Sequence, residues 1–222
     1  MRSSTLYRLV CAWPALHIFL LTLLCALVAW YVMPLASQAW LLQESGPIEA
    51  PTAGLFGLLA LIGLLWRPPH SSRISWLAVC ILCAAAGARE MDWHSRWTGK
   101  SIFKVSYYLD AAPWAHKILA LLALLLVFAS AIYLVWKYAL QLWQGLLHSN
   151  PFARTVATLF FTLVFSKILD RSVNLLIEDF GVAVAPATAM LVKMMEETCE
   201  LSLPLMVALA VWQHWRQHQT TP

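Results

Sequence analysis

The sequence predicts an all-α protein, a polytopic transmembrane helical bundle of about six spans with both termini in the cytoplasm. Of its 222 residues, 61% are hydrophobic and only 12% are charged, whereas soluble domains carry about 25% charged residues. Long uncharged runs recur along the chain, and a helix needs about 20 apolar residues to cross the hydrocarbon core. The 12 Trp residues fit the aromatic belts at the two membrane surfaces. An ordinary water-soluble globular protein is therefore excluded.

The first span is predicted at residues 13–35, inside a stretch from Leu9 to Gln43 that holds no charged residue. A cleaved signal peptide is the alternative, because Ser37-Gln38-Ala39 has the small residues of a cleavage site. The apolar run is longer than the roughly 7–15 residues of a signal peptide. We therefore expect a retained transmembrane helix.

Five further spans follow, and prolines mark two of their boundaries. The second span stops at Arg67-Pro68-Pro69, because proline cannot continue a helix. Ser149-Asn150-Pro151 is typical of a turn, an N-cap and a proline in the first helical turn, which separates the fourth span from the fifth. The five spans are predicted at 49–66, 74–93, 114–147, 151–174 and 187–212.

Short connections join these spans, so we expect residues 1–222 to form a single integral membrane domain. The segment Ser101–Leu109 alternates roughly between polar and apolar residues, but its paired tyrosines suit an interfacial helix or loop. A spanning strand would need a closed barrel, which the long apolar runs exclude.

The charges indicate the orientation. An even number of spans leaves both termini on one side, and that side would carry basic residues and no acidic ones. These basic residues are Arg2, Arg8, Arg67, Arg73, Lys137, Arg154 and Arg216. Unpaired basic residues in tails and short loops are typical of the cytoplasmic side. The basic loops are short and lack interleaved aromatic residues, so no nucleic-acid binding is expected.

Acidic residues gather at one depth on the opposite side. The uncharged runs in the third, fifth and sixth spans cover only about 18–23 Å of a core about 30 Å thick, so charged residues must enter the hydrocarbon zone. Counted from the cytoplasmic helix ends, the acidic residues lie about 18–27 Å up their helices. They are Glu49, Glu90, Asp170, Glu196, Glu197 and Glu200.

This acidic layer predicts a cation- or proton-binding site made by Glu49, Glu90, Asp170, Glu197 and Glu200. A charge at membrane depth costs about 2.5–3.5 kcal/mol and faces the bundle interior or water. The layer also holds basic residues that can act as charge partners, namely Arg89, Lys167, Arg171 and Lys193. The acidic residues outnumber them, which leaves carboxylates that are protonated, hydrated or bound to a cation.

Two alternatives stay open. The first is a metal-assisted hydrolase of a lipid or another membrane-soluble substrate, in which Glu90, His94, Glu196 and His116 hold a divalent metal. Glu90 and His94 are four residues apart and would lie one helical turn from each other. The second is a structural or assembly protein whose charges are ion pairs. The expected partners are the lipid bilayer and a cation or lipid-like ligand, and an oligomer is compatible with each reading.

Three segments carry a resemblance to other proteins. They are Glu44–Ala53, which reads E-x-G-x-x-E-x-x-T-A, Arg89–His94, which reads REMDWH, and Glu196–Leu201, which reads EE-x-x-E-L. In this order they resemble uncharacterised bacterial polytopic inner-membrane proteins with acidic helix ends, over most of the chain. The resemblance implies a multi-pass location in the bacterial inner membrane and no particular activity.

Overall fold

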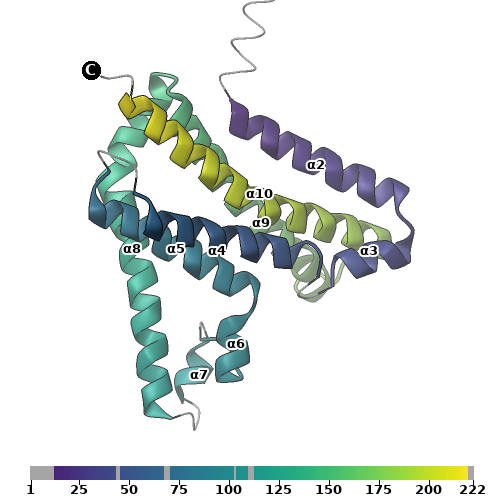
Figure 1. The fold of residues 1–222 in the computed structure, drawn as a ribbon. Helices are drawn as coiled ribbons and strands as arrows, with labels where there is room; N and C mark the ends of the chain where they lie inside the picture. The colour runs from purple at the N-terminus through teal and green to yellow at the C-terminus, as the bar shows by residue number, and fades with distance from the viewer. Residues whose placement is uncertain (1–12, 44–45, 68–70, 103, 110–112, 220–222) are drawn as a thin grey trace, which may run out of the picture. The chain divides into compact units, whose positions relative to one another are not determined.

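The computed structural model describes residues 13–43, 46–67, 71–102, 104–109 and 113–219, without the side chains of His94, His218 and Gln219. Every regular element in these ranges is a helix, which confirms the all-α class. The helices are α2 (Pro14–Val32), α3 (Leu35–Leu41), α4 (Glu49–Leu65), α5 (Arg73–Glu90), α6 (Trp93–Thr98), α7 (Val105–Leu109), α8 (Trp114–Leu147), α9 (Pro151–Glu178) and α10 (Pro186–Gln219) (Figure 1).

Six of these helices lie where the spans were predicted. Among the described residues, α2, α8 and α9 are both long and apolar enough to cross a membrane, which is compatible with a membrane protein. The apolar helix α4 is shorter. The structure differs from the prediction at the end of α5, which stops at Glu90 rather than near residue 93. Asp92 adopts a left-handed conformation with φ of 48°, which ends the helix and starts α6 in a new direction.

The chain divides into two compact units, and each is described by itself. Unit 1 comprises residues 1–52 and 141–222, and unit 2 comprises residues 53–140. Unit 1 therefore holds α2, α3, α9 and α10 with the first turn of α4 and the last turns of α8. Unit 2 holds the rest of α4, together with α5, α6, α7 and most of α8.

In unit 1, α2 packs along α10, and α9 packs against both (Figure 1). The core of this group is a cluster of buried residues, Ala15 and Phe19 from α2 with Cys199 and Met206 from α10. Aromatic rings of α9 meet the Phe19 ring edge to face, with Phe161 at 5.4 Å between centroids. Such pairs add to the apolar burial.

Contacts at the helix ends define the directions within unit 1. The Arg154 guanidinium at the start of α9 lies 4.5 Å from the centre of the Trp13 ring at the start of α2. At the opposite end, the indole N–H of Trp30 donates to the carbonyl of Ala187 at the start of α10 (3.0 Å). Therefore α2 and α9 run parallel to each other, and α10 runs antiparallel to both.

The turn between α8 and α9 has the predicted cap. The Asn150 side chain accepts hydrogen bonds from the backbone N–H groups of Phe152 (2.9 Å) and Ala153 (3.4 Å), and Pro151 is the first helical residue. This is the usual role of an N-cap asparagine. Gly145 lets the two helices approach closely, because a Cβ at this position would lie 2.8 Å from the Cβ of Ala153.

Small hydroxyl residues form a buried stripe along α9. The stripe consists of Thr155, Thr158, Thr162 and Ser166. The hydroxyls of Thr158 and Thr162 donate to the carbonyls of Arg154 and Thr158, each at 2.9 Å, within their own helix. Thr162 also lies 3.8 Å from the sulfur of Met206 on α10. Small side chains of this kind let transmembrane helices pack closely.

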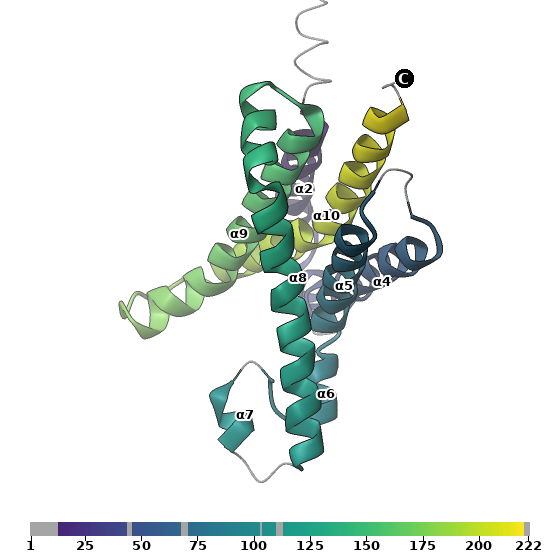
Figure 2. The same cartoon turned by 90° about the vertical axis from the view of Figure 1, so that its left-hand side faces the viewer.

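In unit 2, two glycines allow α4 and α5 to lie in close contact (Figure 2). A Cβ on Gly87 of α5 would lie 3.0 Å from the carbonyl oxygen of Ala53 and 3.3 Å from the Cβ of Phe56. Further along, a Cβ on Gly63 would lie 2.5 Å from the sulfur of Cys80, and the Gly63 carbonyl accepts a hydrogen bond from the Trp76 indole (2.6 Å).

This contact makes Gly87→Val a sensitive test of unit 2. We expect the variant to lower the free energy of unfolding by roughly 1–3 kcal/mol, because the added side chain must push against the α4 backbone. The matched control is Gly54→Val in α4, where a Cβ would meet nothing within 4 Å. Thermal unfolding in detergent, followed by circular dichroism, should show a large decrease for the first variant only. Equal decreases would contradict the close α4–α5 contact.

Candidate functional site

Three carboxylates are buried on one face of α10. Glu196, Glu197 and Glu200 are only 5%, 3% and 6% exposed. Glu196 and Glu200 are four residues apart and Glu197 and Glu200 are three apart, so all three project on neighbouring sides of the same two turns. Buried carboxylates are rare unless they are paired or bound, so their surroundings decide what they can do.

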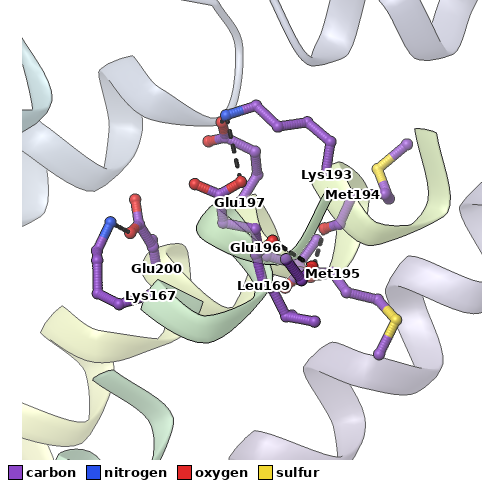
Figure 3. Close-up of polar contacts among 10 residues, drawn as sticks. Lys167, Leu169, Lys193, Met194, Met195, Glu196, Glu197 and Glu200 are labelled. Carbon is purple, nitrogen blue, oxygen red and sulfur yellow. Dashed lines mark hydrogen bonds and ion pairs between the residues drawn. The ribbon is translucent and has the colours of Figure 1, made fainter. Parts of the chain in front are cut away.

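Lys193 supplies the first partner, from one turn earlier in α10 (Figure 3). Its Nζ atom lies 2.6 Å from Oε1 of Glu197 and 3.4 Å from Oε2 of Glu196. The shorter distance makes Glu197 the principal partner. The electrostatic attraction of Lys193 to Glu196 is therefore weaker than its attraction to Glu197.

Lys167 supplies the second partner, and this ion pair joins two helices. Its Nζ atom extends from α9 to Oε1 of Glu200 on α10, at 2.5 Å (Figure 3). At this distance the two charged groups are in direct contact. It links α9 to α10 at the level of the buried carboxylates.

A pocket of about 250 Å³ lies between α9 and α10, beside Lys193. Its polar lining comes from Asp170, Asn174, Lys193 and Glu196, and its apolar lining from Leu169, Val173, Ala189 and Val192. The charge of Asp170 acts repulsively on Glu196, and Glu49 acts in the same way on Glu197. The pocket thus holds two carboxylates that repel each other beside one lysine that is shared with Glu197.

The structure brings most of the predicted layer together in unit 1. Around the buried face of α10 it places five carboxylates and two lysines, namely Glu49, Asp170, Glu196, Glu197, Glu200, Lys167 and Lys193. Arg171 is exposed on α9, next to Asp170 in the chain. Glu90 and Arg89 belong to the last turn of α5 in unit 2, and neither is without an interaction partner.

The proposed metal ligands are spread over both units. Glu90 ends α5, His94 belongs to α6, and His116 is exposed in the first turn of α8, whereas Glu196 belongs to α10 in unit 1. Within the described part of the chain, no group of three or more His, Cys, Asp or Glu residues is arranged to hold a metal ion. The metal site therefore stays a prediction.

Asn174 is a pocket residue that the sequence analysis missed. Charged residues alone predicted the acidic layer, and a neutral amide does not interrupt an uncharged run. Asn174 is nevertheless four residues after Asp170, so it had to lie on the same face of α9 one turn further along. A search for polar residues at helical spacing from each predicted carboxylate would have found it.

Comparison with protein-family models, with curated proteins and with solved structures finds no match to this chain.

Proposed function

We propose that this chain is a multi-pass inner-membrane protein that binds a cation or a proton at the pocket between α9 and α10. One observation carries the proposal. Asp170 and Glu196 line the same pocket, while the lysine that lines it, Lys193, lies closer to Glu197 than to Glu196.

Charge balance in the membrane supports a bound cation or proton. The pocket holds two carboxylates, Asp170 and Glu196, and one lysine, Lys193, whose principal partner is Glu197, so the fully ionised pocket carries excess negative charge. Each uncompensated charge at membrane depth costs about 2.5–3.5 kcal/mol. A proton or a metal cation at the pocket removes part of that excess where Lys193 contributes least. Carboxylate and amide oxygens, as Asp170, Glu196 and Asn174 offer, suit a hard cation.

The helix directions in unit 1 support an even number of spans. Because α2 and α9 run parallel, the chain between them must cross the membrane an odd number of times. Crossings by α4, α5 and α8 satisfy this condition, and α10 returns antiparallel to α9 as the sixth span. The start of α2 and the end of α10 then share one side, which the basic loops assign to the cytoplasm.

Infrared spectroscopy of the protein in lipid nanodiscs tests the proposal directly. We expect the carboxylate bands to change when Na⁺ or Mg²⁺ is added or when the pH is lowered. Glu196→Gln and Asp170→Asn should each weaken this response about tenfold or more, since interactions with charged groups contribute about 1.5–3 kcal/mol. Asp179→Asn, which alters an exposed carboxylate just after α9, should leave the response unchanged.

Identical spectra for the wild type and all three variants would overturn the proposal. The carboxylates would then be balanced by Lys167 and Lys193 alone, as in a protein whose charged layer has only a structural role. A response to acid without a response to either metal ion would assign the pocket to a proton.

A further inference from the structure

The pocket between α9 and α10 is larger than a bare ion requires. Its volume of about 250 Å³ has room for roughly eight water molecules at about 30 Å³ each. Half of the residues that line it are aliphatic, Leu169 and Val173 on α9 and Ala189 and Val192 on α10. A proton or a metal ion makes no use of this aliphatic wall, whereas a cation that carries a hydrocarbon chain does.

The charged and aliphatic parts of the wall follow one another along α10. Glu196 comes four residues after Val192 and seven after Ala189, so the three residues lie on one side of the helix. Seven residues span about 10 Å of helix axis. The carboxylate of Asp170, from α9, lines the same pocket. The pocket therefore combines two carboxylates with an aliphatic wall that continues towards the start of α10.

The buried carboxylate of Glu196 requires a positively charged partner. This residue is only 5% exposed, and an ammonium group compensates such a carboxylate by its charge and by its N–H donors. The Lys193 side chain shows that an ammonium fits here, because its Nζ atom lies 3.4 Å from Oε2 of Glu196. Its closer contact is with Glu197, at 2.6 Å. A carboxylate has about four lone-pair sites, so Glu196 can accept hydrogen bonds from a second ammonium.

A metal ion would be held less completely by the same pocket. The side-chain oxygens that line it belong to Asp170, Glu196 and the Asn174 amide, whereas Ca²⁺ takes about six to eight oxygen ligands. Water molecules would have to complete the shell of the ion. Those next to the aliphatic wall would find no hydrogen-bond partner there, which is unfavourable.

We propose that the cation bound at this pocket is a primary alkylammonium ion. Its ammonium lies between Asp170 and Glu196, and its hydrocarbon chain lies along Val192 and Ala189. This inference rests on the proposed function, because it names the cation that the same pocket binds. The roughly 10 Å between the levels of Glu196 and Ala189 leaves room for a chain of several carbon atoms.

Equilibrium dialysis of radiolabelled butylammonium and methylammonium tests the proposal on the full-length protein in lipid nanodiscs, with empty nanodiscs as the blank. We expect butylammonium to bind at least tenfold more tightly than methylammonium, because each buried CH₂ group strengthens binding roughly three- to fourfold. Butan-1-ol, which has the same chain but no charge, should not displace butylammonium.

Two matched variants locate the hydrocarbon chain. Ala189→Phe fills the aliphatic end of the pocket and should bring the two amines to within about twofold of each other, with little change for methylammonium. Ala183→Phe adds the same side chain at an exposed position before α10 and should keep the preference for butylammonium. Glu196→Gln should weaken the binding of both amines about tenfold or more, because each loses a charged partner.

The possible failures separate this inference from the proposed function. Equal or absent binding of the two amines, or an Ala189→Phe variant that keeps the preference, would overturn the alkylammonium ligand. If the infrared response to Na⁺, Mg²⁺ or acid is then still present, the cation or proton site itself stands. Loss of both amine binding and the infrared response would overturn the ligand and the proposed function together.

Discussion

The Lys193→Met variant is expected to lose about 2–3 kcal/mol of stability. Removing the ammonium leaves Glu196 and Glu197, both nearly fully buried, without their nearest positive charge. Breaking a fully buried pair costs about 3–5 kcal/mol. The loss should be smaller here, because the Lys193 side chain is 43% exposed and solvent screens part of its charge. Thermal unfolding in detergent should show a clearly lowered midpoint.

Two further variants locate the cause of that loss. Lys193→Met combined with Glu197→Gln should recover most of the lost stability, because the principal partner no longer carries a charge. Arg171→Met removes an exposed positive charge at the same level of α9 and should change the stability by no more than about 0.5 kcal/mol. An equal decrease in the Arg171 variant would show that the general charge of the layer matters more than the Lys193 contact.

The Lys167→Glu variant is expected to be the most disruptive single change in unit 1. It replaces the partner of Glu200 by a second carboxylate, and the Glu200 side chain is only 8% exposed. Two negative charges in contact at this level should cost about 3–5 kcal/mol, the range for a broken buried pair. The damage should appear as separation of α9 from α10, because this ion pair joins the two helices.

The charge-swapped variant, Lys167→Glu with Glu200→Lys, separates a specific contact from general sensitivity of the site. An ion pair between the two positions should return about half or more of the lost stability. Lys167→Met provides the intermediate case, with a charge removed and none reversed. If Lys167→Glu melted at the wild-type temperature, the 2.5 Å contact would have no part in holding the helices together.

The helix boundaries could be predicted closely because they depend on the residues next to them in the chain. Asn150 and Pro151 mark the start of α9 by cap geometry and by the fixed φ of proline. The uncharged run from Ile118 to Trp136 marks the centre of α8. The end of α5 was missed by a few residues. The left-handed conformation of Asp92 depends on the chain that follows it, and nothing in the residues around it distinguishes it from a continuing helix.

The candidate site was predictable in composition but not in pairing. Counting residues along each helix predicted that Glu49, Asp170 and the α10 carboxylates lie at one level. The pairing of Lys193 with Glu196 and Glu197 could be expected from its spacing of three and four residues. The partnership of Lys167 with Glu200 depends on the relative rotation and register of α9 and α10. Small buried residues such as Thr162 and Ser166 set that register through close packing, which a single sequence does not reveal.

The packing of α2 against α10 has a consequence for biosynthesis. The contact between Trp30 and Ala187 joins residues 157 positions apart, and chains are made at about 5–20 residues per second. After α2 enters the membrane, about 8–30 s must therefore pass before α10 emerges. During that time lipid has to cover the face that later meets α10. The buried residues on this face, Ala15, Phe19 and Ala26, are all apolar. Lipid can therefore cover this face of α2 until α10 is made, without contact to a charged group.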